Sequence, residues 1–465
     1  MVSVTAKDEN FRDEVQRGNI WKIVFRVCVP LAIYSWISQL FSVLDTLMAS
    51  RISSEAVSTV VYMVQLQHIV LSVGQGLSVG GGIMIAHAYG RGDWERIRRI
   101  LSTTIALCLV LSLLILAAIP FTPSLLRLSG TPEIFIELGS LYFSVTLLGI
   151  IIQFFTTIYI SCERCRGRSR RILFLNLSVV IIKLVVTALF VYVLEGDIVS
   201  IAAATLISYT ILFIYALKAF CTKDDAFSFS RKYITFRKEM LSQLFRLSVP
   251  SMIEKMAFAA GKAMVNNMAA GYGTDIVGAA GISNNMSGLL TGIQTGFEDG
   301  GASLEGQLYG SRNFERTVKV YRHIQAAVSI IAVAGFFIML ALTDPIARLF
   351  SLSRGGYDPS FHSSICSIFH YELFGTLLLS FTYSGFTLLL GMGKTKTILA
   401  INVARIFVFR LPVIFFFQHF TSLDFTAVGL TMAISNSSVG IVALIAGEVI
   451  IRKERKRLSA SRTHE

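Results

Sequence analysis

Long apolar stretches separated by short polar segments run along almost the whole chain. The apolar stretches are continuous, as in residues 100–119 and 172–194, and each has roughly the 20 residues that a helix needs to span a bilayer. Strands of a membrane barrel would instead alternate over about ten residues. The pattern predicts twelve spanning helices, near residues 24–49, 57–84, 100–120, 138–161, 172–194, 199–219, 245–270, 277–304, 322–343, 366–390, 398–418 and 425–450.

The two halves of the chain repeat one another. Pro30 and Pro250 lie 220 positions apart, and Tyr89-Gly90 and Tyr309-Gly310 keep the same separation. Two longer segments also return, residues 90–96 at 310–316 and residues 167–176 at 393–402. A period this long duplicates a whole domain. Six spans in each half make both halves enter the membrane in the same sense, so we predict an all-α integral membrane protein with two six-helix lobes related by a pseudo-two-fold axis along the membrane normal.

These patterns divide the chain into five parts. The N-terminal residues are polar and charged and lack the apolar core of a cleavable signal. One basic stretch between the halves resembles a linker on an anionic membrane surface. We predict a cytoplasmic N-terminal segment at 1–22, an N-lobe at 23–219, a cytoplasmic linker at 220–244, a C-lobe at 245–450 and a basic cytoplasmic tail at 451–465.

Composition and charge agree with a membrane protein. The chain is 54% hydrophobic and 15% charged, whereas soluble domains carry about 25% charged residues. Of the 42 Lys and Arg residues, 33 fall in the two termini, in every second loop or at the span ends that adjoin them, four in the opposite loops and five deeper inside spans. The positive-inside rule therefore places both termini in the cytoplasm of a multi-pass plasma-membrane protein. The net charge of +13 is a topology signal, and we expect no nucleic-acid partner.

Motifs typical of enzymes are incomplete. Cys162 and Cys165 have the spacing of a zinc pair, but no second pair follows. The segment 76–80 fits a nucleophile elbow without a preceding strand or a triad, and Gly393-Lys-Thr lacks the first glycine of a phosphate loop. We therefore expect no metal, no cofactor and no membrane-embedded enzyme, and a receptor or channel fits duplicated six-span halves poorly.

Several short motifs occur in a characteristic order over residues 20–450. They are Asp45-Thr-Leu-Met48, Gly76-Leu-Ser-Val-Gly80, the segment 90–96, Pro250-Ser-Met-Ile-Glu254 and Gly393-Lys-Thr-Lys-Thr397. With them the chain resembles the multidrug and toxic compound extrusion (MATE) family of antiporters, in the multidrug/oligosaccharidyl-lipid/polysaccharide flippase superfamily. The resemblance implies a monomer that exports small organic, often cationic, compounds by alternating access, driven by inward H⁺ or Na⁺. A lipid-linked glycan flippase of the same architecture is the alternative.

Polar residues within the N-lobe spans are functional candidates, because a charge at the bilayer centre costs about 2.5–3.5 kcal/mol. Asp45 resembles the family's N-lobe acid that binds the coupling ion, although it could also be interfacial. In the fifth span Lys183 and Thr187 stand where relatives often carry Asn and Asp. A buried carboxylate beside an ammonium can stay ionised, so we predict an Asp45–Lys183 pair and no N-lobe sodium site, unless Lys183 reaches an interface. Two further candidates are Asn176 in the same span and Thr205, which matches a family Thr.

The C-lobe spans hold acids and bases together. Glu254 lies four residues after Pro250, where the family often carries a Glu for the coupling ion, although it could instead pair with Lys255 or Lys262. The family's companion acid in the tenth span is missing, with Ser380 near its place. The remaining charged and polar positions predict a charge network, structural or functional, formed by Glu298, Asp299, Lys262, Asn266, Arg405 and Arg410.

Overall fold

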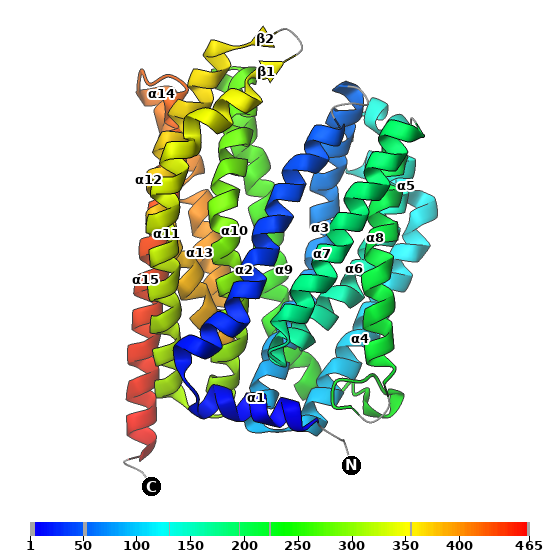
Figure 1. The fold of residues 1–465 in the computed structure, drawn as a ribbon, viewed down its shortest axis with the longest axis vertical. Coiled ribbons are helices and arrows are strands. Elements are labelled where there is room, and N and C mark those ends of the chain that lie inside the picture. The colour runs from blue at the N-terminus through cyan, green and yellow to red at the C-terminus, as the bar shows by residue number, and fades with distance from the viewer. Residues whose placement is uncertain are drawn as a thin grey trace. The chain divides into compact units, whose positions relative to one another are not determined.

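The described chain is almost entirely helical (Figure 1). The computed structural model describes residues 5–49, 54–129, 131–194, 196–222, 225–353 and 356–462. It divides into two compact units, Met1–Gly18 with Leu40–Met256 (unit 1) and Asn19–Gln39 with Ala257–Glu465 (unit 2). The division falls inside two helices, α2 and α9, and the predicted lobe boundaries at 219 and 245 stay predictions.

The first half of the chain contains these elements in order. They are α1 (Ala6–Arg17), α2 (Ile20–Ala49), α3 (Ser54–Arg91), α4 (Trp94–Ala118), η1 (Ile119–Phe121), α5 (Thr122–Leu128), α6 (Glu133–Cys165), α7 (Ser169–Ala188), the π-helical η2 (Leu189–Val193), α8 (Ile198–Phe220) and η3 (Arg231–Tyr233).

The second half follows with α9 (Lys238–Ala269), η4 (Ala270–Tyr272), α10 (Thr274–Gly310), α11 (Phe314–Phe350), the antiparallel pair β1 (Leu352–Ser353) and β2 (Gly356–Tyr357), α12 (Pro359–Gly391), α13 (Thr395–Phe407), α14 (Leu411–Phe420) and α15 (Thr426–Arg462). In the register of the β pair, Leu352 lies opposite Tyr357.

Each of the twelve predicted spans coincides with a long helix or, in one case, with two short ones. Ten helical stretches among the described residues are long and apolar enough to cross a membrane. The helices α9 and α10 are not among these ten, and they carry most of the charged C-lobe candidates. The seventh and eighth spans, α9 and α10, are therefore more polar than the other spans.

The predicted eleventh span is not one helix. Helix α13 ends at Phe407 and α14 begins at Leu411, with Pro412 in its first turn. Proline has no N–H to donate and its ring clashes with the preceding turn, which kinks or breaks a helix. Helices α2 and α9 continue through Pro30 and Pro250, whereas at Pro412 the helix breaks. The span predicted at 398–418 is found, since Thr395–Phe420 is long and apolar enough to cross a membrane. It is interrupted, and the break places Arg410 directly before a new helix.

The internal repeat has a structural counterpart at the turns that connect the helices. Gly92 and Arg312, equivalent at the 220-residue offset, both have positive φ, of 72° and 60°. The next residues, Asp93 and Asn313, both cap a helix by accepting a bond from the backbone N–H three residues later. A left-handed turn followed by an N-cap thus recurs in each half, and in the second half a non-glycine residue occupies the strained position.

Close helix contacts build each unit. In unit 1, α3 packs along α6 and α6 along α8. In unit 2, α12 packs against α10, α11 and α15, which run beside it in Figure 1. Gly440 of α15 permits this packing, because a Cβ there would lie 1.9 Å from the carbonyl oxygen of Leu378. The apolar centre of unit 2 includes Ile365, Phe369 and Leu373.

A buried charge network fastens the N-terminal helix to unit 1. Helix α1, which the sequence patterns did not predict, lies across the end formed by α3, α4 and the α6–α7 loop (Figure 1). Arg166 donates from Nε and Nη2 to the Asp8 carboxylate at 3.1 and 2.7 Å, and its Nη1 lies 3.1 Å from Asp225. Arg168 adds a 3.2 Å bond to Asp8, and Glu163 approaches both arginines at 3.7 Å.

The Asp8 carboxyl is stabilised in its charged form by this network. Burial alone would raise its pKa, but the bonds and charges of Arg166, Thr5 and Arg168 together hold the pKa below the ordinary value of 3.8. The Tyr89 hydroxyl also donates to the Asp8 carbonyl oxygen at 2.6 Å. Helix α1 is therefore held to unit 1 by buried hydrogen bonds and ion pairs.

Candidate functional site

The N-lobe candidates on α7 and α8 bond mainly to their own helices. Asn176 is buried and donates to the carbonyl oxygen four residues earlier at 2.8 Å, and Thr205 does the same at 3.0 Å. The hydroxyl of Thr187 is buried without a hydrogen-bond partner among the described residues. Lys183 is half-buried, and the side chain of Asp45 lies outside the described residues, so the Asp45–Lys183 pair stays a prediction.

The acids of the seventh and eighth spans are half-buried. Glu254, Glu298 and Asp299 are each partly accessible to solvent. Glu254 lies on the part of α9 that belongs to unit 1, whereas Lys262 and Asn266 lie on the part that belongs to unit 2. Lys262 and Asn266, one helical turn apart, are both exposed.

Two arginines and an amide meet at the break between α13 and α14. Arg410 is buried, with 3% of its surface exposed. Its Nη2 donates to Asn436 Oδ1 at 3.2 Å and its Nε to Ser435 Oγ at 3.3 Å. The same Asn436 oxygen accepts from Arg405 Nη2 at 2.7 Å, and Ser435 Oγ donates to the Arg405 carbonyl oxygen at 3.1 Å. Helix α15 thus holds both guanidinium groups through neutral side chains.

A lysine and a glutamate join these arginines. Lys262 Nζ and Arg405 Cζ each lie 5.3 Å from the centre of the Phe258 ring, a cation–π distance. Lys262 interacts electrostatically with Arg410, Arg405 and Glu372. Glu372 of α12 is buried and accepts a 2.6 Å hydrogen bond from the Ser283 hydroxyl of α10. We call Lys262, Arg405, Arg410 and Glu372 the basic cluster.

The structure thus brings together three of the predicted residues, Lys262, Arg405 and Arg410, and adds a fourth, Glu372, that the sequence analysis missed. The tenth span carries a buried acid, Glu372, although the position expected for the family's companion acid is occupied by Ser380. Glu372 lies about two turns before Ser380, the position at which the family acid is expected. A single Glu inside an otherwise apolar window was the signal that would have identified it.

A second buried acid, Glu305 of α10, also escaped the sequence predictions. Its residue is 0% exposed, and Oε1 accepts a 2.9 Å bond from Thr387 Oγ1. Oε2 is buried without a hydrogen-bond partner among the described residues. Gly391 permits this burial, since a Cβ there would lie 2.8 Å from the Glu305 Cβ. Glu305 falls one position beyond the predicted eighth span, but the repeat places Ile85 at the equivalent position, which marks the acid as unusual.

Possible metal ligands gather at one place among the described residues. His362 Nε2 lies 3.2 Å from Asp344 Oδ1 and 3.7 Å from Cys366 Sγ, and the three ligand atoms all lie within 4.8 Å of one another. Asp344 is exposed. The Cys162–Cys165 pair is buried in α6 as free thiols, with Cys165 Sγ 3.9 Å from the Gly82 carbonyl oxygen, which is consistent with helix packing.

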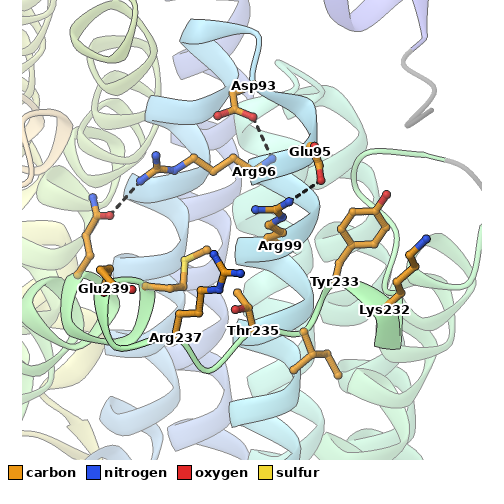
Figure 2. A pocket seen from close by; sticks show the side chains of 12 residues that line it. Asp93, Glu95, Arg96, Arg99, Lys232, Tyr233, Thr235, Arg237 and Glu239 are labelled. Carbon is orange, nitrogen blue, oxygen red and sulfur yellow. Dashed lines mark hydrogen bonds and ion pairs between the residues drawn. The ribbon is translucent and has the colours of Figure 1, made fainter.

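A polar cleft of about 840 Å³ lies in unit 1 where α4 and α9 begin (Figure 2). Arg96 donates to Gln243 at 3.1 Å across it, and Arg99 pairs with Glu95 at 2.6 Å. Arg237 and three further charged or aromatic side chains, Lys232, Tyr233 and Glu239, complete the rim. Because its cations alternate with acids and none of the intramembrane candidates lines it, this cleft fits a solvated surface better than a transport site.

Comparison with known proteins decides the family. The MatE family model matches residues 30–189 and 250–416, which fall on the two halves of the repeat. The chain belongs to the MatE family. MatE proteins are multi-pass membrane proteins and secondary transporters rather than enzymes. The resemblance to the MATE antiporters is therefore confirmed.

Relatives match this MatE chain over most of its length at low identity. It is 23% identical to a probable multidrug resistance protein, YoeA, of Bacillus subtilis, over 91% of this chain and 92% of the relative. It is also 23% identical to the multidrug export protein MepA of Staphylococcus haemolyticus, over 86% and 87% of the two chains.

Solved structures share the MatE fold. A MATE crystal structure in complex with MaL6 superposes with a TM-score of 0.89 at 22% identity, covering 95% of this chain and 99% of that one. A transporter from Pyrococcus furiosus, described as having a binding pocket of reverse polarity, gives 0.88 at 21% identity, covering 97% and 99%. At such identities these likenesses establish the all-α twelve-helix fold.

Proposed function

We propose that this MatE chain is a proton-coupled antiporter that exports organic compounds across the plasma membrane by alternating access, with both termini in the cytoplasm. Multidrug export by relatives such as MepA supports an organic substrate. The distribution of Lys and Arg between alternate loops supports the orientation. The main support for proton coupling is the buried carboxyl group of Glu305.

Glu305 has the surroundings of a proton carrier. Its side chain contacts one hydroxyl group, that of Thr387, and no ion pair joins it to a cation among the described residues. A carboxylate buried without a cation is costly, and taking up a proton removes that cost. A hard metal cation would instead need several oxygen ligands. Release of the proton would leave a buried charge, so an alternative conformation that hydrates Glu305 would be favoured.

Transport by purified protein in liposomes tests this proposal. We would load two xanthene dyes, the anion fluorescein and the cation rhodamine 123, and impose a pH gradient or a Na⁺ gradient separately. We expect a pH gradient alone to drive dye movement in the wild-type protein. Movement driven only by the Na⁺ gradient would refute proton coupling.

Two variants locate the coupling group. Glu305→Gln keeps the shape but cannot exchange a proton, so we expect gradient-driven transport to be lost while the thermal stability is retained. Glu315→Gln makes the same chemical change at an exposed acid of the same unit that pairs with Arg455 at 3.0 Å, and transport should persist. Wild-type transport by Glu305→Gln would assign the proton to another acid, such as the predicted Asp45 or Glu254.

A further inference from the structure

We infer that the basic cluster of unit 2 recognises an anionic group, a carboxylate, sulfonate or phosphate, on the transported compound. This inference rests on the proposed transport function and names a substrate class for it. The resemblance to MATE antiporters instead implies compounds that are often cationic.

The Arg410 guanidinium is a positive charge held in place by neutral groups. It is 3% exposed, and it donates hydrogen bonds to Ser435 Oγ and Asn436 Oδ1. Neutral acceptors fix the orientation of a guanidinium but leave its charge in place, and a buried charge is normally paired with an opposite one. Glu372 interacts electrostatically with Arg410 and also with Lys262, so one carboxylate is shared among several cations. An anion that reaches this end of the cluster would offset the remaining positive charge.

Lys262 presents a second positive charge at an accessible position. Its side chain is exposed although it lies next to two arginines that repel it, and among the described residues the acid that interacts with it is Glu372. Glu372 is itself buried and already accepts the Ser283 hydroxyl at 2.6 Å. Around Lys262 there are thus two like charges and one opposite charge, an environment that attracts anions and repels cations.

The helix break reinforces the same polarity. Helix α14 begins at Leu411, directly after Arg410, and the N-terminal end of a helix carries partial positive charge. Broken helices in transporters often direct such ends at anionic substrate groups. Asn266, exposed one turn beyond Lys262, offers hydrogen bonds to an uncharged part of the same ligand.

Binding of two dyes of opposite charge tests the inference without requiring transport. We would measure fluorescence polarisation of fluorescein and of rhodamine 123 with the purified full-length protein in detergent. We expect fluorescein to bind more tightly. Lys262→Gln should weaken fluorescein binding by about ten- to a hundredfold, the effect of losing one charge-assisted hydrogen bond, and Lys262→Glu should reverse the preference toward rhodamine 123.

The matched control is Lys255→Gln, which removes the same charge from α9 seven residues earlier. This variant should bind fluorescein as the wild type does. Equal or tighter binding of rhodamine 123 by the wild type, no measurable fluorescein binding, or equal losses in Lys255→Gln and Lys262→Gln would each overturn the inference.

The binding result is separable from the transport result. If fluorescein binds through Lys262 but neither gradient moves it in liposomes, the anion site stands and the proposed antiport fails. In the other case, a pH gradient moves rhodamine 123 while the wild type binds the two dyes equally and Lys262→Glu leaves their binding unchanged. The proposed antiport then stands and the anion site fails.

Discussion

Breaking the buried network that holds α1 should destabilise unit 1 by an amount that depends on which partner is removed. The Asp8 and Arg166 side chains are 2% and 7% exposed, and disrupting such a buried pair costs about 3–5 kcal/mol. Asp8→Ala leaves Arg166 with Asp225 at 3.1 Å and Glu163 at 3.7 Å. We therefore expect a free energy of unfolding that is lower by about 3 kcal/mol, the lower end of that range.

Arg166→Ala should cost more, about 5 kcal/mol. It leaves the buried acids Asp8 and Glu163 with only Arg168 and Arg171, whose side chains are 20% and 47% exposed and therefore better solvated. The double variant should lose less than the two single losses added together, because each single change leaves a charge that the other would remove.

Unfolding by titration with SDS in mixed micelles, followed by tryptophan fluorescence, measures these free energies. Trp94 reports on α1 directly, since its ring lies 5.8 Å from the Arg12 guanidinium. Glu95→Ala is the control, because it breaks an exposed pair with Arg99, which should contribute only about 0.3–0.5 kcal/mol. If Arg166→Ala lost no more than this control, or if the two single losses were strictly additive, the reasoning about the network would be refuted.

The network should also respond to pH in one direction. The lowered pKa of Asp8 stabilises the folded state above the unfolded value of 3.8, and this contribution is lost as the pH falls below 3.8 through the folded pKa. The difference in unfolding free energy between wild type and Asp8→Asn should therefore be constant near neutrality and shrink below that pH. A difference that grew on acidification would contradict this assignment of the sign.

Four further predictions concern single positions. Lys183→Ala should destabilise by about 3–5 kcal/mol and more than its combination with Asp45→Ala, if these residues pair, and a strictly additive thermal-shift cycle would exclude the pair. If Glu254 rather than Glu305 carries the coupling ion, Glu254→Gln should abolish gradient-driven efflux without changing membrane insertion, and efflux at the wild-type rate would remove this acid from the mechanism. Arg312→Gly should raise stability by about 1 kcal/mol in thermal unfolding, because φ is 60° there, and a loss of stability would contradict a strained turn. Cys221 is exposed, so a membrane-impermeant maleimide should label it in inside-out vesicles and not in intact cells, and the opposite pattern would reverse the proposed topology.

The sequence alone determined where the long apolar helices lie, because an apolar run of about 20 residues is a local property that needs no tertiary partner. The polar helix α1 carries no such run and was not predicted. It also predicted the repeat, whose turns at Gly92 and Arg312 share one backbone conformation. Pro412 carried a local signal for the helix break as well, although the apolar pattern around it favoured a continuous span.

Only the tertiary structure decided which charges are buried and with whom. Asp8 meets Arg166 across 158 positions, Ser283 meets Glu372 across 89, and Glu305 meets Thr387 across 82. No periodicity identifies such pairs, because the sequence pattern around a polar residue is the same whether its side chain faces water or another helix. Burial of a charge follows from how helices pack, and packing sets both the cost of that charge and the partner that offsets it.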